Sequence, residues 1–250
     1  MLTAERHHYI LEVLKNEGRV LAPLLSEQLG VSIDTVRRDL RDLAGEGRLQ
    51  RVHGGALPIS PASDSFSERR RHLTPQKVSI AARAAKLVEN GMVIVMGGGI
   101  TNVQTAEHFP IGLHATVITH NPPAAVALAE HPHVEVILVG GRLDKYTMVT
   151  VGPEAVTGFQ RVRADLCFLG VCSLHPEAGI CDFHYEDVQV ERAMIDCAAE
   201  VVALASSEKL NTTASFVVGP LSELNVLVTD ETSDDLLRPY RAAGIEIFQV

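Results

Sequence analysis

The sequence contains no tryptophan, and only 4% of its 250 residues are aromatic, so the core is expected to be aliphatic. Its apolar runs are short, and none approaches the roughly 20 residues that a membrane-spanning helix requires. The first nine residues carry charge and lack the apolar centre of an export signal. We therefore expect a cytoplasmic protein that does not enter membranes.

Cysteine is also scarce, with four residues in the whole chain. In a chain without an export signal, this number favours reduced thiols over a disulfide framework. The hydrophobic fraction of 46%, in contrast, is ample for a large core and excludes disorder as the dominant state.

The net charge of −9 argues against nucleic-acid binding only if it is spread evenly along the chain. Through His72 there are eleven Lys and Arg residues against ten Asp and Glu, whereas from Leu73 onward there are eleven against twenty-one. The acidity belongs to the second part. The near-neutral first part can still present a positive face to DNA if its arginines are grouped.

Three short helices are expected in the N-terminal region. The pattern from Leu2 to Asn16 is helical and Gly18 ends it, while a second helix begins near Pro23 and is broken by Gly30. Leu21 stands where the second helix needs an N-cap. Because leucine cannot accept the free amide hydrogen bonds of a first turn, this helix is predicted to start poorly capped.

The third helix carries both a buried stripe and a basic face. Ser32 is a good N-cap, and Gly45 marks the end of the pattern. Val36, Leu40 and Leu43 recur at i, i+4 and i+7, which predicts one buried stripe. Arginines project on the other side, so this helix can enter a major groove and contact phosphates or guanine edges.

The helix is followed by residues 48–53, which alternate charged and apolar side chains before two glycines and predict a small β wing. The wing would hold the flanking DNA backbone. The alternative for the helix is a solvated face on which its arginines pair with neighbouring aspartates, namely Asp34, Asp39 and Asp42. The expected DNA contacts are Ser32, Thr35, Arg37, Arg38, Arg41, Arg48, Arg51 and His53.

The rest of the chain is predicted to be a separate α/β domain. Residues 58–74 lie in a stretch rich in Pro, Ser and charge without periodicity, which predicts a linker. Beyond it, short apolar strands alternate with helices, which implies a mostly parallel sheet covered on both faces. The expected strands are Val93–Met96, Thr116–Thr119, Glu135–Val139, Leu166–Leu169, Val201–Ala205, Asn225–Val228 and one from Glu246 toward Val250.

The N-terminal segments closely resemble the DeoR family of bacterial transcription regulators. The resemblance rests on G-V-S-I-D-T-V-R-R-D-L-R-D-L from Gly30 to Leu43 and on R-V-H-G-G-A from Arg51 to Ala56. The first segment contains the Thr-x-Arg-Arg-Asp-Leu recognition helix of the family. Similar segments follow in the C-terminal part at Leu138–Leu143, Val151–Ala155, Ala164–Gly170 and Glu191–Ile195.

The resemblance implies a winged helix-turn-helix over residues 1–57 and an effector-sensing domain over residues 75–250. The sensor fold of the family is similar to sugar-phosphate isomerases and CoA transferases. The resemblance further implies repression of a carbohydrate-use operon, relieved by a phosphorylated sugar or related metabolite, with no catalysis and no cofactor. Double-stranded operator DNA and a small-molecule effector are the expected partners. We also expect a homo-oligomer, because DNA-reading modules of this size need paired half-sites.

The effector pocket is expected at the carboxyl ends of the parallel strands, where ligands collect in open sheets. A glycine loop between a strand and a helix start offers free amides to a phosphate, although a glycine cluster alone also serves as a plain turn. Three further strand-end loops, one glutamate and one lysine complete the set. The predicted effector-binding residues are Gly97, Gly98, Gly99, Thr101, Asn102, Thr119, His120, Asn121, Gly140, Gly141, Arg142, Gly170, Cys172, Glu186 and Lys209.

This chain departs from the family pattern inside that pocket. Residues 97–101 read Gly-Gly-Gly-Ile-Thr where the family usually has Asp-Ser-Gly-Thr-Thr, and residues 170–174 read Gly-Val-Cys-Ser-Leu in place of Gly-Ala-x-Gly-Ile. Glu191 stands where a lysine is common. These differences predict an unusual effector.

Two other functions compete for the C-terminal domain. An enzyme of the sugar-phosphate isomerase or deaminase type would need an acid-base group, and Glu186 or His184 qualifies by composition, but no complete catalytic set is visible. A metal or redox sensor would use Cys172, His175, Cys181 and His184, whose side chains can all ligate zinc. The spacing between these pairs differs from common zinc-finger spacings, so packed thiols with exposed histidines are favoured.

Overall fold

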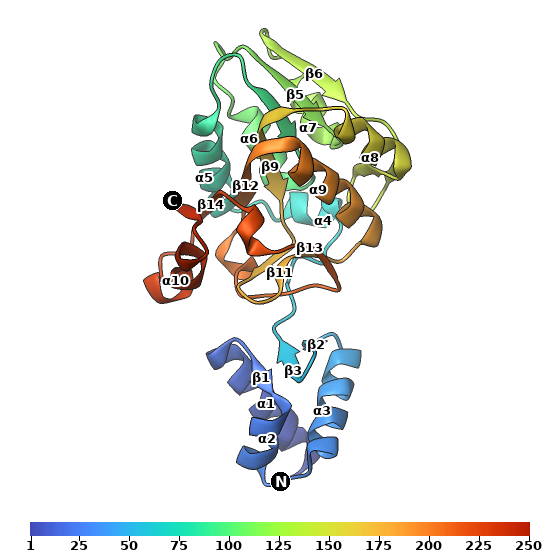
Figure 1. Ribbon diagram of the computed structural model, residues 1–250, viewed down its shortest axis with the longest axis vertical. Coiled ribbons are helices and arrows are strands. Elements are labelled where there is room, and N and C mark those ends of the chain that lie inside the picture. Colours follow the sequence, from blue (N-terminus) through green and yellow to red (C-terminus); the bar gives the residue numbers. More distant parts are fainter.

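The computed structural model describes residues 1–250 and places two folded parts one above the other, joined by a single narrow segment of chain (Figure 1). The N-terminal part has its own core of ten buried residues. Its elements are α1 (Thr3–Glu17), β1 (Val20–Leu21), α2 (Ala22–Leu29), α3 (Ile33–Gly45), β2 (Gln50–Val52) and β3 (Gly55–Leu57).

Glycine and serine set the limits of these helices as the sequence predicts. Gly18 and Gly30 end α1 and α2 with φ of 70° and 62°, in the left-handed region that favours glycine. The side chain of Ser32 caps α3 by accepting a hydrogen bond from the amide of Thr35 at 3.2 Å. At the start of α2, the side chain of Leu21 makes no capping bond, which confirms the prediction of a poor cap.

The buried stripe of α3 forms the centre of the N-terminal core. Val36, Leu40 and Leu43 are at most 3% exposed and pack with Ile10 of α1 and Leu25 of α2. Burial of these three side chains contributes several kcal/mol to the stability of the domain, because transfer of each from water to the core contributes about 1.5–3 kcal/mol. The core therefore fixes which face of α3 points outward.

The wing has a third strand that the sequence does not predict. β1 and β2 both pair antiparallel with β3, in the order β1-β3-β2. Gly55 allows the close approach, because a Cβ at that position would lie 1.8 Å from the carbonyl oxygen of Val20. A strand of two residues is too short to show a period in the sequence.

The C-terminal part is built on a seven-stranded sheet in which every neighbouring pair is parallel, in the order β15-β14-β12-β9-β4-β5-β6. All seven strands coincide with predicted ones to within a few residues. Their bounds are β4 (Val93–Met96), β5 (Ala115–Thr119), β6 (Val134–Leu138), β9 (Ala164–Gly170), β12 (Ala198–Leu204), β14 (Val226–Thr229) and β15 (Glu246–Gln249).

Helices cover both faces of this sheet, as the strand-helix alternation predicts (Figure 1). On β4, Ile94 and Met96 point to one core and Val95 points to the other. One face carries α5 (Pro75–Ala84), α6 (Ile100–Glu107) and α7 (Pro122–Leu128); the other carries α8 (Pro153–Gln160), α9 (Tyr185–Cys197) and α10 (Asp234–Ala242). No helix combines the length and the apolar character that crossing a bilayer demands.

Two small antiparallel units flank the main sheet and were not predicted. Their strands have only three or four residues, which is too short for a reliable alternation signal. One unit is the hairpin of β7 (Arg142–Asp144) and β8 (Val149–Val151), and the other is the sheet of β10 (Ser173–His175), β11 (Gly179–Asp182) and β13 (Phe216–Gly219).

The segment 58–74, predicted to be a linker without regular structure, folds against the C-terminal part and contains α4 (Phe66–Arg71). Its backbone exchanges two hydrogen bonds of 2.9 Å with Thr213, through Pro58 and Ser60. Phe66 is buried, and its amide donates to the carbonyl of Tyr146 at 2.7 Å. The Ser-x-x-Glu capping box at residues 65–68 is a sequence signal from which this helix start could have been predicted.

We predict that Gly55→Ala destabilises the N-terminal domain by about 1–3 kcal/mol, because its Cβ must push the backbone of β1 away from β3. Calorimetry of the full chain measures the transition of this domain. Gly45→Ala is the matched control: nothing lies within 4 Å of the added carbon, and the domain should keep its stability. Equal transitions for wild type and Gly55→Ala would show that the wing tolerates the side chain.

Candidate DNA-binding surface and candidate effector pocket

The face of α3 opposite its buried stripe is exposed and basic. Arg37, Arg38 and Arg41 are all exposed, and Thr35 is half-buried at the start of the helix. Arg37 lies 3.4 Å from Asp34, while Arg38 and Arg41 make no ion pair or side-chain hydrogen bond within the chain. Two guanidinium groups on this face are therefore available for phosphates or bases.

The alternative in which the arginines of α3 pair with its aspartates holds only for Arg37. Asp39 is buried, and its carboxylate accepts hydrogen bonds of 2.8 and 2.9 Å from Arg6 of α1. This bidentate pair ties α1 to α3 and has a structural role. The predicted wing residues are exposed as well, namely Arg48, Arg51 and His53.

A cavity of about 310 Å³ lies at the carboxyl ends of the central strands, between the sheet and the segment 58–74. This volume falls in the range of small-molecule sites. It opens where β4, β9 and β12 end, as expected for a parallel sheet. Of the predicted effector residues, those that line it are Gly98, Gly99, Thr101, His120, Gly170, Cys172 and Lys209.

Other predicted residues support the glycine loop from below and do not line the cavity. The side-chain amide of Asn102 donates to the carbonyl of Gly98 at 2.9 Å, and that of Asn121 donates to the carbonyl of Gly97 at 3.0 Å. The hydroxyl of Thr119 donates to the carbonyl of Met96 at 2.6 Å. These buried bonds fix the backbone of the loop, so its geometry is set before any ligand arrives.

The remaining predicted effector residues lie away from the cavity. Gly140, Gly141 and Arg142 are exposed, and Arg142 forms an ion pair with the exposed Glu186. The expectation that all four strand-end loops converge is thus met by three of them. The loop that begins at Gly140 turns away because residues 142–151 form the β7-β8 hairpin. Of this hairpin, only residues 147 and 149 line the cavity.

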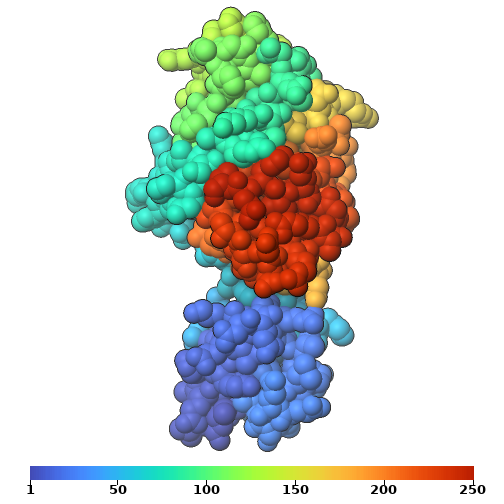
Figure 2. All heavy atoms as spheres, turned by 90° about the vertical axis from the view of Figure 1, so that its left-hand side faces the viewer, coloured from blue at the N-terminus to red at the C-terminus, as the bar shows by residue number.

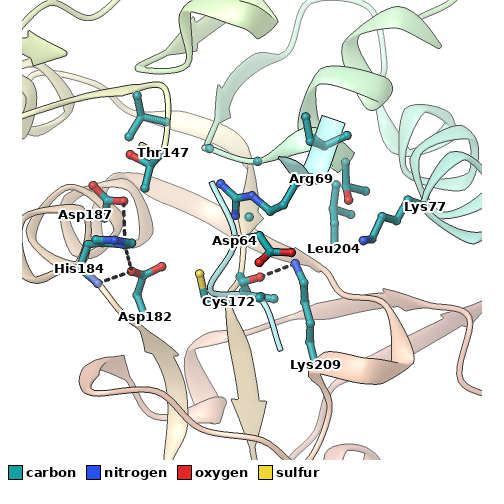
Figure 3. Close-up of a pocket in the computed structure, with 18 of the residues that line it drawn as sticks. Asp64, Arg69, Lys77, Thr147, Cys172, Asp182, His184, Asp187, Leu204 and Lys209 are labelled. Carbon is teal, nitrogen blue, oxygen red and sulfur yellow. Dashed lines mark hydrogen bonds and ion pairs between the residues drawn. The ribbon is translucent and has the colours of Figure 1, made fainter. Parts of the chain in front are cut away.

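The basic side of the cavity comes largely from residues that the sequence reasoning missed. Arg69 and His72 enter from the segment 58–74, and Lys77 comes from α5. Lys209 closes the group: its Nζ donates to the carbonyl of Val171 at 2.7 Å, and burial lowers its pKa. Figure 3 shows Arg69, Lys77 and Lys209 surrounding the same space.

The opposite side of the cavity is acidic and was not predicted as a group. Asp182 at the end of β11 and Asp187 in α9 flank His184, whose Nδ1 lies 3.5 Å and 4.0 Å from their carboxylate oxygens (Figure 3). Burial and the charge of Asp182 raise the pKa of Asp187 to about 7, and burial raises that of Glu191. The cavity is therefore bipolar, with most of its cations opposite these carboxylates, although Lys77 on the basic side lies 3.3 Å from Glu208.

His120 places an unpaired acceptor on the cavity wall. It is 2% exposed, its Nδ1 lies 3.0 Å from the carbonyl of Thr150, and its Nε2 has no partner. Burial lowers its pKa to about 4, so the ring is neutral near pH 7. Because a carbonyl can only accept, Nδ1 carries the proton and Nε2 offers a lone pair to a ligand hydroxyl.

The four side chains of the Cys/His arrangement do not form a common ligand set. His175 accepts two backbone hydrogen bonds from the tight turn that follows it, and Cys181 donates to the carbonyl of Ala178. Of the four, only His184 belongs to a group of metal-ligating side chains close to one another, and its neighbours there are aspartates.

A helix-turn-helix with an exposed arginine face, joined to an α/β domain with a polar cavity, defines a ligand-responsive DNA-binding regulator of transcription. Residues 6–62 match the DeoR-like helix-turn-helix domain, and residues 73–231 match the DeoR C terminal sensor domain. The chain belongs to the DeoR family. This confirms the resemblance seen in its recognition helix and in its C-terminal segments.

Relatives match along almost the whole chain. The HTH-type transcriptional regulator GlpR of Haloferax volcanii is 32% identical over 250 residues, covering 99% of this chain and 98% of the relative. The glycerol-3-phosphate regulon repressor of Escherichia coli is 28% identical over 231 residues, covering 92% of each chain. Among solved structures, ribose 5-phosphate isomerase A of Methanocaldococcus jannaschii matches 53% of this chain and 52% of its own at 18% identity and a TM-score of 0.39.

We predict that His120 makes the stability of the C-terminal domain depend on pH. The unfolded chain takes up a proton near pH 6.5 and the folded chain only near pH 4, so this contribution is complete above about pH 6.5 and is lost as pH falls toward 4. The loss amounts to about 3 kcal/mol. Urea unfolding from pH 7 to 4 should show this slope in the wild type and a shallower one in His120→Asn; parallel profiles would contradict the buried neutral ring.

Proposed function

We propose that this protein represses a carbohydrate-use operon by binding its operator, and that a phosphorylated sugar or related metabolite releases it. The observation that carries the proposal is the position of the cavity: one wall is the segment 58–74, which continues directly from strand β3 of the wing. A ligand in the cavity thus touches the chain that leads to the DNA-binding domain. The name of the Escherichia coli relative, a glycerol-3-phosphate regulon repressor, supports repression linked to a phosphate ester.

On the DNA side, we propose that residues 1–57 read the operator with α3 in the major groove. Arg38 and Arg41 have no partners in the chain, and Arg37 has only an exposed ion pair that costs little to break. We propose that Ser32 and Thr35 at the helix start contact a phosphate and that the wing residues contact the adjacent backbone. One protomer reads too few base pairs to select a site in a genome, so we propose a homo-oligomer on repeated half-sites.

On the effector side, we propose that the basic half of the cavity holds the phosphate. Lys209, Arg69 and Lys77 supply charge, and the loop 97–99 supplies backbone amides at the start of α6. The unpaired Nε2 of His120 and the acidic half then accept hydrogen bonds from hydroxyl or amino groups of the ligand. The role proposed for the cavity is recognition, in line with the transcriptional regulators to which the chain is similar.

The glycine-rich loop supports an effector that differs from those of typical relatives. A Cβ at Gly98 would lie 3.0 Å from the side chain of Val149, so there is little room for a larger residue. At Gly99 there is space for a Cβ, but the φ of 94° is one that residues other than glycine rarely adopt. The loop therefore gives close backbone contact in place of the side-chain carboxylate and hydroxyl usual in the family.

We predict that Arg37→Ala and Arg38→Ala each weaken operator binding by roughly 5- to 150-fold, the equivalent of 1–3 kcal/mol for a lost base contact. An arginine that contacts only phosphate will also lower the slope of affinity against salt. Fluorescence anisotropy with operator DNA at several salt concentrations measures both effects. Arg161→Ala, an exposed arginine on the sensor domain, is the control and should bind like the wild type; wild-type affinity in both α3 variants would show that another surface reads the DNA.

We predict that Lys209→Ala abolishes the response to the effector while operator affinity persists, because an effector acts only through its different affinity for the two states. Gly98→Val should behave likewise by filling the phosphate approach. Reporter expression should stay low with inducer, and calorimetry should show no binding of the sugar phosphate. Lys145→Ala, at an exposed lysine outside the cavity, should induce normally. Normal induction in both cavity variants would place the effector elsewhere.

A further inference from the structure

Three metal-ligating side chains converge on the acidic wall of the cavity. One carboxylate oxygen of Asp182, one of Asp187 and a ring nitrogen of His184 all lie within 4.8 Å of one another. We propose that these three residues bind a divalent transition-metal ion, a site independent of the phosphate-binding half proposed above. The three come from the end of β11 and the start of α9, so a bound ion would join these two elements.

The spacing of the donors is already near that of a coordination sphere. Ligand atoms about 2.1 Å from a metal are separated by about 3–3.4 Å in octahedral or tetrahedral geometry. The Nδ1 of His184 lies 3.5 Å from Asp182 and 4.0 Å from Asp187, and no two of the three donor atoms are more than 4.8 Å apart, so shifts of about 1.5 Å or less bring them into a coordination sphere. In Figure 3 both carboxylates face the same edge of the imidazole ring.

An unpaired hydroxyl supplies an independent sign of a ligand at this place. Thr147 is 8% exposed, lines the same cavity, and its Oγ1 has no hydrogen-bond partner. It lies beside Asp187 (Figure 3), close enough for a weak side-chain contact with that carboxylate and with Asp144 but outside ordinary hydrogen-bond geometry. A buried hydroxyl without a partner is costly. A metal-bound water, or a carboxylate turned by the metal, would satisfy it as an outer-sphere contact.

Glu191 adds a further carboxylate to the same wall. It lies one turn after Asp187 on α9, is 8% exposed, faces the cavity and makes no hydrogen bond or ion pair. Three buried acidic groups thus lie on one wall, with His184 beside the two aspartates and Lys209 near Glu191, and a divalent cation would balance the remaining negative charge. Glu191 is positioned to serve as a fourth ligand, leaving the remaining coordination positions toward the cavity.

The donor set selects the class of ion. One imidazole with two or three carboxylates suits Mn²⁺, Fe²⁺, Co²⁺ or Zn²⁺, whereas Mg²⁺ prefers oxygen donors and keeps its waters. A structural role as a plain ion pair between His184 and the two aspartates is the competing account, and it predicts no affinity for metal ions.

The experiment uses the full-length, tag-free protein after chelator treatment, without DNA or sugar phosphate, so that it is separate from the test of effector binding. Calorimetric titration with MnCl₂ should show one ion per chain. Asp187→Asn and His184→Gln should weaken binding by more than about 100-fold, and Thr147→Val by about tenfold. Glu186→Gln is the matched control on the same helix; its exposed side chain pairs with Arg142, and the variant should bind as the wild type does.

Pulsed electron paramagnetic resonance of the bound Mn²⁺ gives a signature that an ion pair cannot produce. The wild type should show coupling to a ¹⁴N nucleus of imidazole, and His184→Gln should lose it while circular dichroism stays unchanged. If a variant fails to fold, the presence or absence of nitrogen coupling in the wild-type spectrum tests the proposal by itself. Absence of stoichiometric binding, a bound ion without nitrogen coupling, or equal weakening by Glu186→Gln would each overturn the proposal.

Discussion

The backbone hydrogen bonds between the segment 58–74 and the sensor domain are the constraint on which the rest of this structure depends. Pro58 and Ser60 bond to Thr213, and the hydroxyl of Ser60 donates to the carbonyl of Cys172 on the cavity wall. These bonds hold the connecting segment 58–74, here called the strut, in a fixed position against the sensor domain. Figure 2 shows the N-terminal part lying directly beneath the C-terminal part; besides the strut, an exposed ion pair between Arg19 and Glu177 links the two parts. Because such surface pairs contribute little, we expect a change at the cavity to be transmitted chiefly through the strut.

The cavity is suited to transmitting a change because its floor, the glycine loop 97–99, is held by hydrogen bonds and its roof is the segment 58–74. The floor is held by buried side-chain amides under the glycine loop, whereas the roof contributes Arg69 from a helix of six residues. A ligand that binds Arg69 would shift α4 and hence the chain that continues from β3. A hydrogen-bonded floor and a short roof that leads to the DNA-binding domain are the parts that we expect a two-state switch to use.

Much of this architecture could be predicted from residue pattern, and the missing parts share a physical cause. The seven parallel strands and the caps of α2 and α3 follow from apolar runs, glycines and one serine, which act locally. The strut, β1 and the small antiparallel sheet are too short to carry a period, and they exist because of tertiary contacts. The acidic wall was missed for the same reason: Asp182 and Asp187 have no motif, and only the approach of β11 to α9 brings them together. Conversely, Arg142 was assigned to the cavity from its loop position and Glu186 from its residue type, and a hairpin carries the first away.

Amide hydrogen exchange tests the central claim, that the strut reports occupancy of the cavity, most directly. The full-length protein is compared alone and with the sugar phosphate that raises its melting temperature most in a ligand screen. The account predicts that exchange at Ser60 and Phe66, whose amides bond to Thr213 and Tyr146, changes at least about tenfold together with the loop 97–101, while exchange in α10 stays constant. Protection confined to the loop, with no change over residues 58–74, would contradict it.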